Sequence, residues 1–305
     1  MPPSATHPAT RLILALALAT TQVALATDTP PRAVPGTADL KTEADAQVLE
    51  KLLRDQHALL DALQNDPETM RLPQAEKERR VLDIMRRHKA LLAQRPGDPL
   101  IMVAYARFLR LVDARAEANH WFEKADALLP DTPVIKHQLG AHAAEEGDYR
   151  RALDLLETAV RLDPQTALYH FHLGEFLATY QRHLVRDALL KRAECDAKMQ
   201  AAFARATALA PAENRYRWRH AESFFECEKP DWKQALGVWE TLRAQAATAA
   251  MREAATLRHA RILIELGRLR EAQNDLDTSK SPGFEAARAA LREQLKQKGP
   301  PTPSS

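Results

Sequence analysis

Apolar residues recur at helical spacing along most of the chain, and short polar or proline-containing segments interrupt the pattern. The stretch ADAQVLEKLLRDQHALLDAL, within about 39–65, places one apolar stripe on a helix that Asp66-Pro67 ends. A second amphipathic helix is expected from about Pro73 to Gln94, before RPGDP breaks the chain again. The first stripe consists of Val48, Leu49, Leu52, Leu53, Leu59, Leu60 and Leu63. No run of alternating Val, Ile and Thr indicates a strand, so the pattern predicts an all-α protein.

A second, longer regularity follows, because one arrangement of small and large residues recurs along the chain. Its clearest copy is LGAHAAEEGDYRRALDLLETAVRLDP, Leu139–Pro164, and the preceding copy lies 34 residues earlier. The clearest copy has a Leu-Gly pair, a Gly-Asp-Tyr turn, spaced alanines, a large apolar residue and a closing proline. Positions that match in the other copies include Tyr105, Ala106, Ala118, Phe122, Ala125, Pro130, Leu173, Gly174, Phe203, Ala206, Pro211, Ala235, Trp239, Gly267 and Ala272.

This pattern resembles the tetratricopeptide repeat, a helix–turn–helix unit. The resemblance implies a right-handed α-solenoid of antiparallel helix pairs, because one pair cannot bury its apolar face without neighbours. The expected units are 99–132, 133–166, 167–213, 214–247 and 253–278, within a solenoid over 99–278. The N-terminal helical pair, 39–98, is a possible divergent unit. An amphipathic helix over 283–298 is expected to cap the solenoid, before a tail, 299–305, that is disordered by composition.

The unit 167–213 departs from the pattern, because it carries about thirteen extra residues between Gly174 and Ala206. The extra block, around QRHLVRDALLKRAECDAKMQ, is itself helix-like in composition. We therefore expect the two helices of this enlarged unit to be longer than usual and to project past the stack.

The N-terminus has the pattern of a secretory signal peptide over residues 1–26. Arg11 precedes the short apolar run LILALALA, and the small residues Ala24 and Ala26 flank an expected cleavage site after Ala26. The run is too short to span a bilayer stably. A proline-rich flexible leader, 27–38, follows, and the sequence predicts a periplasmic or secreted protein. A buried core helix is the alternative for the apolar run.

Charge does not indicate a nucleic-acid partner. Lys and Arg number 43 and Asp and Glu number 41, which leaves a formal net charge of +2 with no strongly basic segment. The segment ENRYRWRH, Glu213–His220, interleaves arginines with Tyr216 and Trp218 in a way that suits stacking on bases. Acidic residues follow it closely, and a solvated helix face is the better interpretation.

Catalytic and cofactor motifs are missing from the sequence. Its 9 glycines are scattered, with no G-x-G-x-x-G or P-loop pattern, and neither G-x-S-x-G nor H-E-x-x-H occurs. His170 and His172 lie two residues apart, so on a helix they point to different sides and do not share one metal. We expect no cofactor, no metal site and no enzymatic activity.

Cys195 and Cys227 are the only cysteines in a chain that is expected to be exported. One lies in the extra block of the enlarged unit and the other follows the first helix of the next unit. A disulfide between them would stabilise the fold by about 3–4 kcal/mol in the chain-entropy model. Two separate buried thiols are the alternative.

The tetratricopeptide resemblance also implies a binding surface, because first helices of successive units line the concave groove in that family. Carried over unit by unit, the groove residues would be Val103, Arg107, Arg110, His137, Gln138, Ala141, Phe171, His172, Glu175, Trp218, Arg219, Glu222, Arg258 and Arg261. These positions do not carry the Lys/Asn/Arg set with which some family members hold a peptide C-terminus. Arginine and aromatic residues suit a protein interface. For Phe171 and Trp218, packing between units is the alternative.

These observations favour a non-catalytic scaffold or adaptor in the cell envelope that binds a protein or peptide in the concave groove. A homo-oligomeric scaffold assembled through the helices of 39–94 is one alternative. An accessory protein with enzymatic or carbohydrate-directed activity at the insertion, 175–205, is another.

Overall fold

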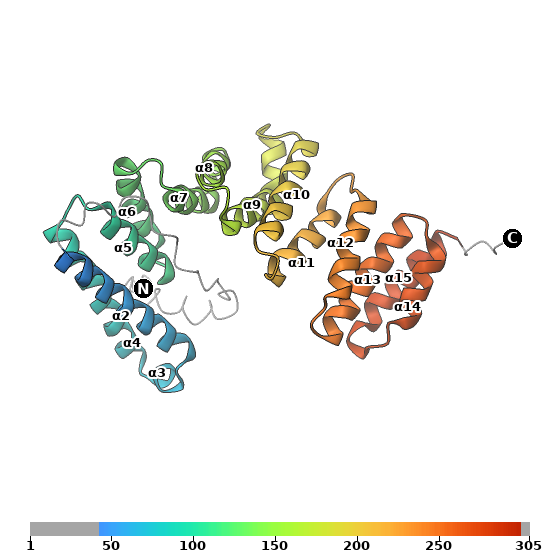
Figure 1. Cartoon of the computed structure of the whole chain (residues 1–305), viewed down its shortest axis with the longest axis horizontal. Helices are drawn as coiled ribbons and strands as arrows, with labels where there is room; N and C mark the ends of the chain where they lie inside the picture. The colour runs from blue at the N-terminus through green and yellow to red at the C-terminus, as the bar shows by residue number, and fades with distance from the viewer. Residues whose placement is uncertain (1–42, 300–305) are drawn as a thin grey trace, which may run out of the picture. The chain divides into compact units, whose positions relative to one another are not determined.

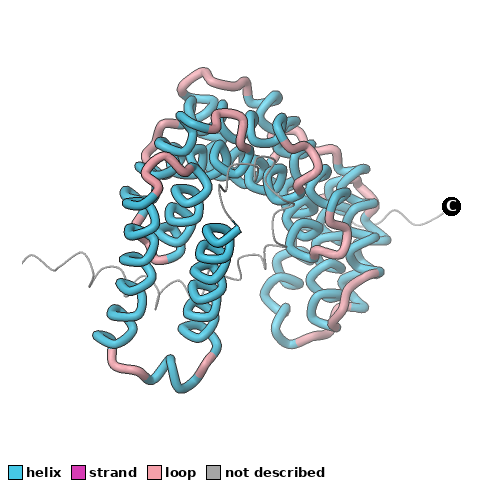
Figure 2. The backbone as a smooth tube through the Cα atoms, turned by 60° about the vertical axis from the view of Figure 1, so that its left-hand side comes forward, coloured by secondary structure: helices cyan, strands magenta, loops and turns pink. Residues whose placement is uncertain are grey.

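The computed structural model describes residues 43–299, and in this range every regular element is a helix (Figures 1 and 2). The expected all-α fold of paired helices is therefore confirmed. The expected signal peptide, the leader and nearly all of the tail lie outside the described residues. None of the helices in the described range is long and apolar enough to cross a bilayer.

The chain divides into two compact units, which meet in sequence between Glu146 and Gly147. Each unit is built from helices that pack on their neighbours along the chain. The first unit contains α2 (Glu43–Asn65), α3 (Pro67–Arg71), α4 (Gln74–Gln94), α5 (Pro99–Leu111), α6 (Arg115–Leu128) and α7 (Pro133–Glu145).

The second unit begins with α8 and ends with α15, and two short 3₁₀ helices lie between its α-helices. Its elements are α8 (Tyr149–Leu162), α9 (Ala167–Arg186), α10 (Arg192–Leu209), α11 (Asn214–Ser223), η3 (Phe224–Glu226), α12 (Trp232–Ala244), α13 (Ala249–Glu265), α14 (Leu269–Thr278), η4 (Pro282–Phe284) and α15 (Glu285–Gln297). Helix α13 begins earlier than the expected unit boundary at 253, because Thr248 Oγ1 accepts a hydrogen bond from Met251 N and caps the helix there.

Local sequence sets where the helices begin and end. Asp66 and Asp98 each precede a proline, and their side chains accept hydrogen bonds from the first free backbone N–H groups of α3 and α5. Gly147 (φ 84°) lies in the turn after α7, where it adopts a backbone conformation that side chains disfavour. Asp113 (φ 60°) and Ala188 (φ 52°) hold the same left-handed conformation in turns that lack a glycine.

The apolar stripe expected on α2 is narrower than the sequence suggests. Leu49 and Leu52 are buried, and Leu52 packs in a small core with residues of α4 and α5. Val48 and Leu53, in contrast, are 51% and 37% exposed, so their assignment to the buried stripe is wrong. Each lies one position from a buried leucine, and a helix turns by about 100° per residue, which carries them off the packed face.

The enlarged pair has helices of 20 and 18 residues, α9 and α10, whereas α7 and α8 have 13 and 14. The expected lengthening is thus present. The two long helices approach closely at Gly174, where a Cβ atom would lie only 2.7 Å from the ring of Phe203. At the start of the extension, Tyr180 packs against Tyr149 of α8, with ring centroids 4.9 Å apart.

Helix α15 packs on α13 and α14 and closes the apolar core of the last two pairs. Leu291 and Leu295 enter this core, which also contains the fully buried ring of Trp239. Polar contacts, which we call the clasp, hold the segment before α15 and the start of α15 on α13. Glu253 of α13 accepts hydrogen bonds from Ser281 N (2.9 Å) and from Arg288 Nη1 (3.0 Å). The clasp orients α15 against α13.

Candidate functional site

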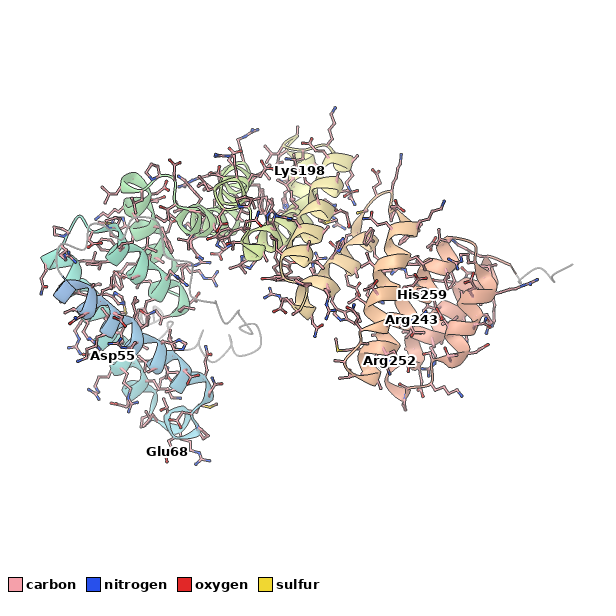
Figure 3. All side chains as sticks on the ribbon, viewed as in Figure 1. Asp55, Glu68, Lys198, Arg243, Arg252 and His259 are labelled. Atoms are coloured by element: carbon pink, nitrogen blue, oxygen red, sulfur yellow. The ribbon has the colours of Figure 1, made fainter. Side chains whose placement is uncertain are left out.

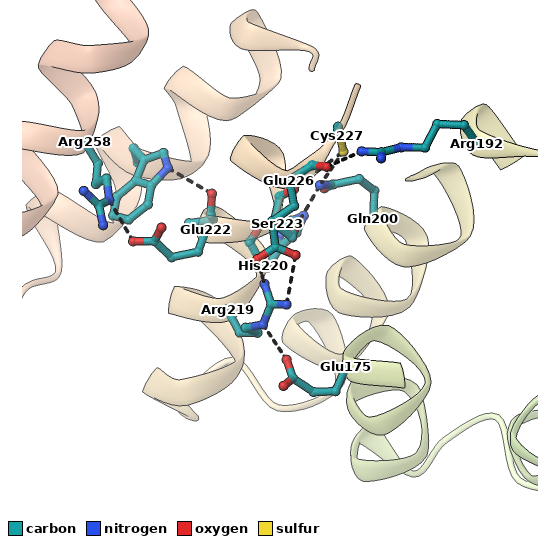
Figure 4. A network of polar contacts seen from close by, with 12 residues as sticks. Glu175, Arg192, Gln200, Arg219, His220, Glu222, Ser223, Glu226, Cys227 and Arg258 are labelled. Carbon is teal, nitrogen blue, oxygen red and sulfur yellow. Dashed lines mark hydrogen bonds and ion pairs between the residues drawn. The ribbon is translucent and has the colours of Figure 1, made fainter. Parts of the chain in front are cut away.

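Helices α9, α11 and α13 of the second unit are joined by ion pairs between residues that the sequence assigns to the groove. Arg219 Nε of α11 lies 2.5 Å from Glu175 Oε1 of α9. Arg258 Nε of α13 lies 2.9 Å from Glu222 Oε1 of α11 (Figure 4). These positions, far apart in sequence, therefore share one face of the second unit, which we call the first-helix face.

The part of this face between α9 and α11 is filled by the protein's own side chains. The Arg219 guanidinium also binds Glu226, at 2.9 and 3.1 Å, and lies 4.6 Å from the centroid of the Phe203 ring. We call this part the closed segment. Its residues are Phe171, Glu175, Phe203, Arg215, Tyr216, Arg219 and Glu226.

Phe171 is only 1% exposed, so its prediction as a groove residue is wrong and the packing alternative is correct. Its ring stacks on Tyr216 of α11 at a centroid distance of 4.5 Å, and the Arg215 guanidinium covers it at the same distance. Next to it, His172 is half-buried, and burial together with the Arg215 charge lowers the pKa of His172 to about 4. The His172 ring is therefore neutral at pH 7.

Between α11, α13 and α15 the face is open. A pocket of about 260 Å³ lies there, which we call the α11–α15 pocket. Leu257 and Leu291, at 3% and 8% exposure, form its apolar floor. The remaining lining residues are Trp218, Glu222, Ala254, Arg258, Arg261, Phe284, Ala287, Ala290 and Gln294.

Small side chains create this pocket. Ala287 and Ala290 lie on the side of α15 that lines it, and Ala254 lies on α13, so no large side chain fills the space between the helices. Trp218 is held by an edge contact with Trp239 of the core, at a centroid distance of 5.2 Å. A rigid aromatic wall next to short alanines gives a recess that can take one large side chain.

The rim of the pocket is positively charged. Arg258 is neutralised by Glu222, but none of the described residues forms an ion pair or hydrogen bond with the Arg261 side chain. Instead the Arg261 guanidinium lies 4.4 Å from the centroid of the Phe225 ring. Stacking on an aromatic ring holds a guanidinium in place and leaves the N–H groups along its edge free to bind a carboxylate.

The groove residues predicted in the first unit are largely engaged within that unit. Arg110 makes two 3.0 Å bonds to the Glu145 carboxylate. His137 is 4% exposed, so its prediction as a groove-lining residue is wrong, and its neighbour Gln138 donates a 3.4 Å bond to His137 Nδ1 in one tautomer. Arg107 is half-buried.

The possible disulfide between Cys195 and Cys227 is not formed in the structure, where both residues are free thiols. Cys195 Sγ donates to the backbone carbonyl of Leu177 at 3.7 Å, towards α9. Cys227 Sγ donates to Ser223 O at 3.5 Å and accepts from Gln200 Nε2 at 3.4 Å. Burial raises the pKa of Cys195 to about 11. The sequence spacing permitted a loop of suitable length but carried no information on where the two Sγ atoms point.

We find no metal-binding cluster of side chains on the described part of this face. Within residues 46–299, no group of three His, Cys, Asp or Glu side chains is arranged to hold a metal ion. A polar cluster elsewhere joins His259 of α13 to Asp275 of α14 at 2.5 Å, with Arg243 of α12 bound to the same carboxylate at 2.9 Å. Figure 3 labels His259 and Arg243 among the side chains of the last pairs. This cluster ties three helices together away from the pocket lining.

The pocket contains residues that the sequence does not predict, namely Ala254 and Leu257 of α13 and the residues contributed by η4 and α15. For the segment of α15 the sequence predicts only an amphipathic helix that caps the solenoid. Its exposed alanines at 287 and 290 were the available signal, since a cap that only covers a core has no need of a small-residue surface at that position.

Solved structures with a fold similar to that of this chain include tetratricopeptide-repeat proteins. YrrB, described as a TPR protein with an unusual peptide-binding site, aligns over 68% of this chain and 97% of its own, with a TM-score of 0.54 and 15% identity. The chain has a tetratricopeptide-type fold. A chain of the Naa15/Naa10 complex bound to HypK-THB matches 81% of this chain and 34% of its own length, with a TM-score of 0.51 and 13% identity.

A tetratricopeptide repeat protein from Parabacteroides merdae ATCC 43184 aligns over 82% of this chain and 86% of its own, with a TM-score of 0.48 and 15% identity. No protein-family model matches the sequence. No curated protein matches it either. The similarity to tetratricopeptide-repeat structures is thus a similarity of fold, at a sequence identity of 13–15%.

Proposed function

We propose that the chain is a non-catalytic scaffold of the cell envelope that binds a protein or peptide partner on the first-helix face of its second unit. The observation that carries this proposal is the α11–α15 pocket, which joins an apolar floor, a tryptophan wall and an arginine-rich rim. Tryptophan and arginine contribute more than other residues to the energy of protein interfaces.

The size of the pocket supports a macromolecular partner. Sites for whole cofactors and drug-sized ligands measure about 300–1,000 Å³. A recess of about 260 Å³ suits one or two side chains of a longer segment that continues across the exposed surface. The solved structure of YrrB is described as having an unusual peptide-binding site, which is consistent with the same class of ligand here.

The cell-envelope location rests on the sequence alone. Arg11, the apolar run that follows it and the small residues Ala24 and Ala26 have the order of a cleavable secretory signal. We expect the envelope fraction of the cells to contain a protein whose intact mass corresponds to a chain that begins at Thr27. A product that retains Met1 and stays with the cytoplasmic fraction would contradict export without affecting the pocket.

Partner binding can be tested by filling the pocket. Ala290 is exposed and lines the pocket, so Ala290→Trp would occupy the recess with little effect on the core. The matched control is Asn274→Trp on the exposed side of α14. Tagged wild-type protein and both variants would be isolated from envelope extract, after circular dichroism confirms that each is folded.

The proposal predicts a specific partner that co-purifies with the wild type and with Asn274→Trp but is lost from Ala290→Trp. Equal recovery of every co-purifying protein by all three forms would contradict binding at this face. Recovery of only a second copy of the chain, in all three forms, would instead favour the homo-oligomeric scaffold.

A further inference from the structure

We infer that the α11–α15 pocket selects an acidic peptide segment, in which a large apolar side chain fills the recess and a nearby carboxylate pairs with Arg261. This inference rests on the proposed function and specifies the chemistry of the partner. It follows from the size of the recess, the charge of its rim and the polar group left free on α15.

The recess takes an apolar side chain. Its floor consists of Leu257 and Leu291, and Trp218 and Phe284 supply aromatic walls. Burying a Leu, Phe or Met side chain in such surroundings stabilises the complex, because apolar surface is removed from water. A charged side chain would lose its hydration there, with two leucines at the base and no buried polar group to replace the lost water contacts.

The rim carries one uncompensated positive charge. Two guanidinium groups, Arg258 and Arg261, face a single carboxylate, Glu222, which is bound to Arg258 at 2.9 Å. Arg261 therefore retains its charge without an acidic partner among the described residues. A ligand carboxylate beside the recess would complete the pairing, whereas a lysine or arginine there would be repelled.

The rim also carries a polar side chain that can bind a peptide backbone. Gln294 of α15 is exposed, and its side-chain amide makes no hydrogen bond to the described residues. An amide group offers both a donor and an acceptor, which matches the alternating groups of an extended peptide. Arg261, stacked on Phe225, loses little freedom when it binds, because its ring contact already fixes it.

The test selects short random peptides displayed on phage against the full purified chain, and counter-selects against Ala290→Trp, in which the recess is filled. We expect the enriched peptides to carry Leu, Phe, Met or Trp with an Asp or Glu within about three residues, which an extended chain spans in about 10 Å. The selected peptide is then synthesised, together with a version in which Lys replaces its acidic residue.

Binding of both synthetic peptides would be measured for the wild type, Arg261→Glu, Arg261→Gln and the control Arg270→Glu on the exposed side of α14. We expect Arg261→Gln to weaken the acidic peptide about tenfold, and Arg261→Glu to prefer the lysine version. Arg270→Glu should bind as the wild type does. Unfolding midpoints of all variants would show that each is folded.

The outcomes separate the two proposals. Enriched peptides without an acidic residue, or an unchanged dissociation constant in folded Arg261→Gln, would overturn the acidic selectivity while leaving peptide binding intact. If no peptide is enriched on the wild type relative to Ala290→Trp, both the selectivity and peptide binding at this pocket are overturned.

Discussion

The first-helix face of the second unit has two parts that differ in what fills them. Between α9 and α11, the rings of Phe171 and Tyr216 stack on each other, and Arg219 binds two glutamates. Between α11 and α15, alanines occupy the corresponding space and leave the α11–α15 pocket. Equivalent helices of one repeating fold therefore carry either internal packing or a binding recess, and side-chain volume at a few positions decides between them.

The difference extends to protonation. His220 of α11 is 7% exposed, and its Nε2 has no hydrogen-bond partner among the described residues. Burial lowers the pKa of His220 to about 4, and that of His172 on α9 is lowered to a similar value. His172 follows Phe171 of the closed segment, and the His220 ring packs on Phe224 of the core, whereas the pocket lining contains no histidine.

The largest expected effect is the response of the buried His220 to acid. A histidine whose folded pKa lies below the unfolded value of 6.5 leaves stability unaffected above pH 6.5 and lowers it as pH falls towards 4. The unfolded chain then binds the extra proton. For His220 the loss reaches on the order of 3 kcal/mol. Denaturant titrations of the wild type and His220→Phe at pH 7 and pH 4.5 would measure it.

His220→Phe should lose less stability between these two pH values than the wild type, because its ring stays apolar against Phe224. Losses of the same size in both proteins would show that acid acts elsewhere, for example on paired carboxylates, and would contradict the role of His220.

The next effect concerns the close approach of α9 and α10. In Gly174→Ala the new Cβ would lie within 3.0 Å of three atoms of the Phe203 ring. That ring is fully buried and is covered by Arg219, so it has no room to move aside. We expect a loss of about 1–3 kcal/mol in the free energy of unfolding.

Gly237→Ala on α12 is the matched control, because nothing lies within 4 Å of its added Cβ. There the higher helix propensity of alanine should stabilise the protein by up to about 1 kcal/mol. Urea denaturation would measure both variants. A stabilised Gly174→Ala protein would mean that the two long helices are packed less tightly than the structure has them.

The smallest effect is expected from Arg219→Met, which keeps an apolar contact with Phe203 and removes the pairing with Glu175 and Glu226. All three charged side chains are partly exposed, at 22%, 37% and 40%, so we expect a loss of about 1 kcal/mol or less. The affinity of the selected acidic peptide should not change. An affinity that falls with this variant would extend the binding site into the closed segment.

Much of the helical architecture could be predicted because its determinants are local. Asp98-Pro99 marks the start of α5, and Gly147 marks the turn after α7, through capping and backbone geometry that neighbouring residues fix. The periodic alanines and the lengthened enlarged pair were also readable from the chain. Val48 and Leu53 were misassigned because an apolar residue beside a stripe is not distinguished by sequence from one within it.

The site was only partly predictable, since it depends on contacts between residues far apart in sequence. Trp218, Arg258 and Arg261 were identified from their positions in the repeat, and they do line the pocket. Phe171 occupies a similar position yet is buried, because Tyr216 of the next pair covers it. The contribution of α15 could not be anticipated, because the recess arises from missing volume at Ala287 and Ala290.

The most direct test of partner binding at the open part of the face is hydrogen exchange of the full chain, with and without saturating selected peptide. Binding at the α11–α15 pocket predicts slower amide exchange in α11, α13 and α15 and unchanged exchange in α10 and α14. Protection confined to α9 and α10, or to the α14 surface that carries Arg270, would contradict the assignment of this pocket as the binding site.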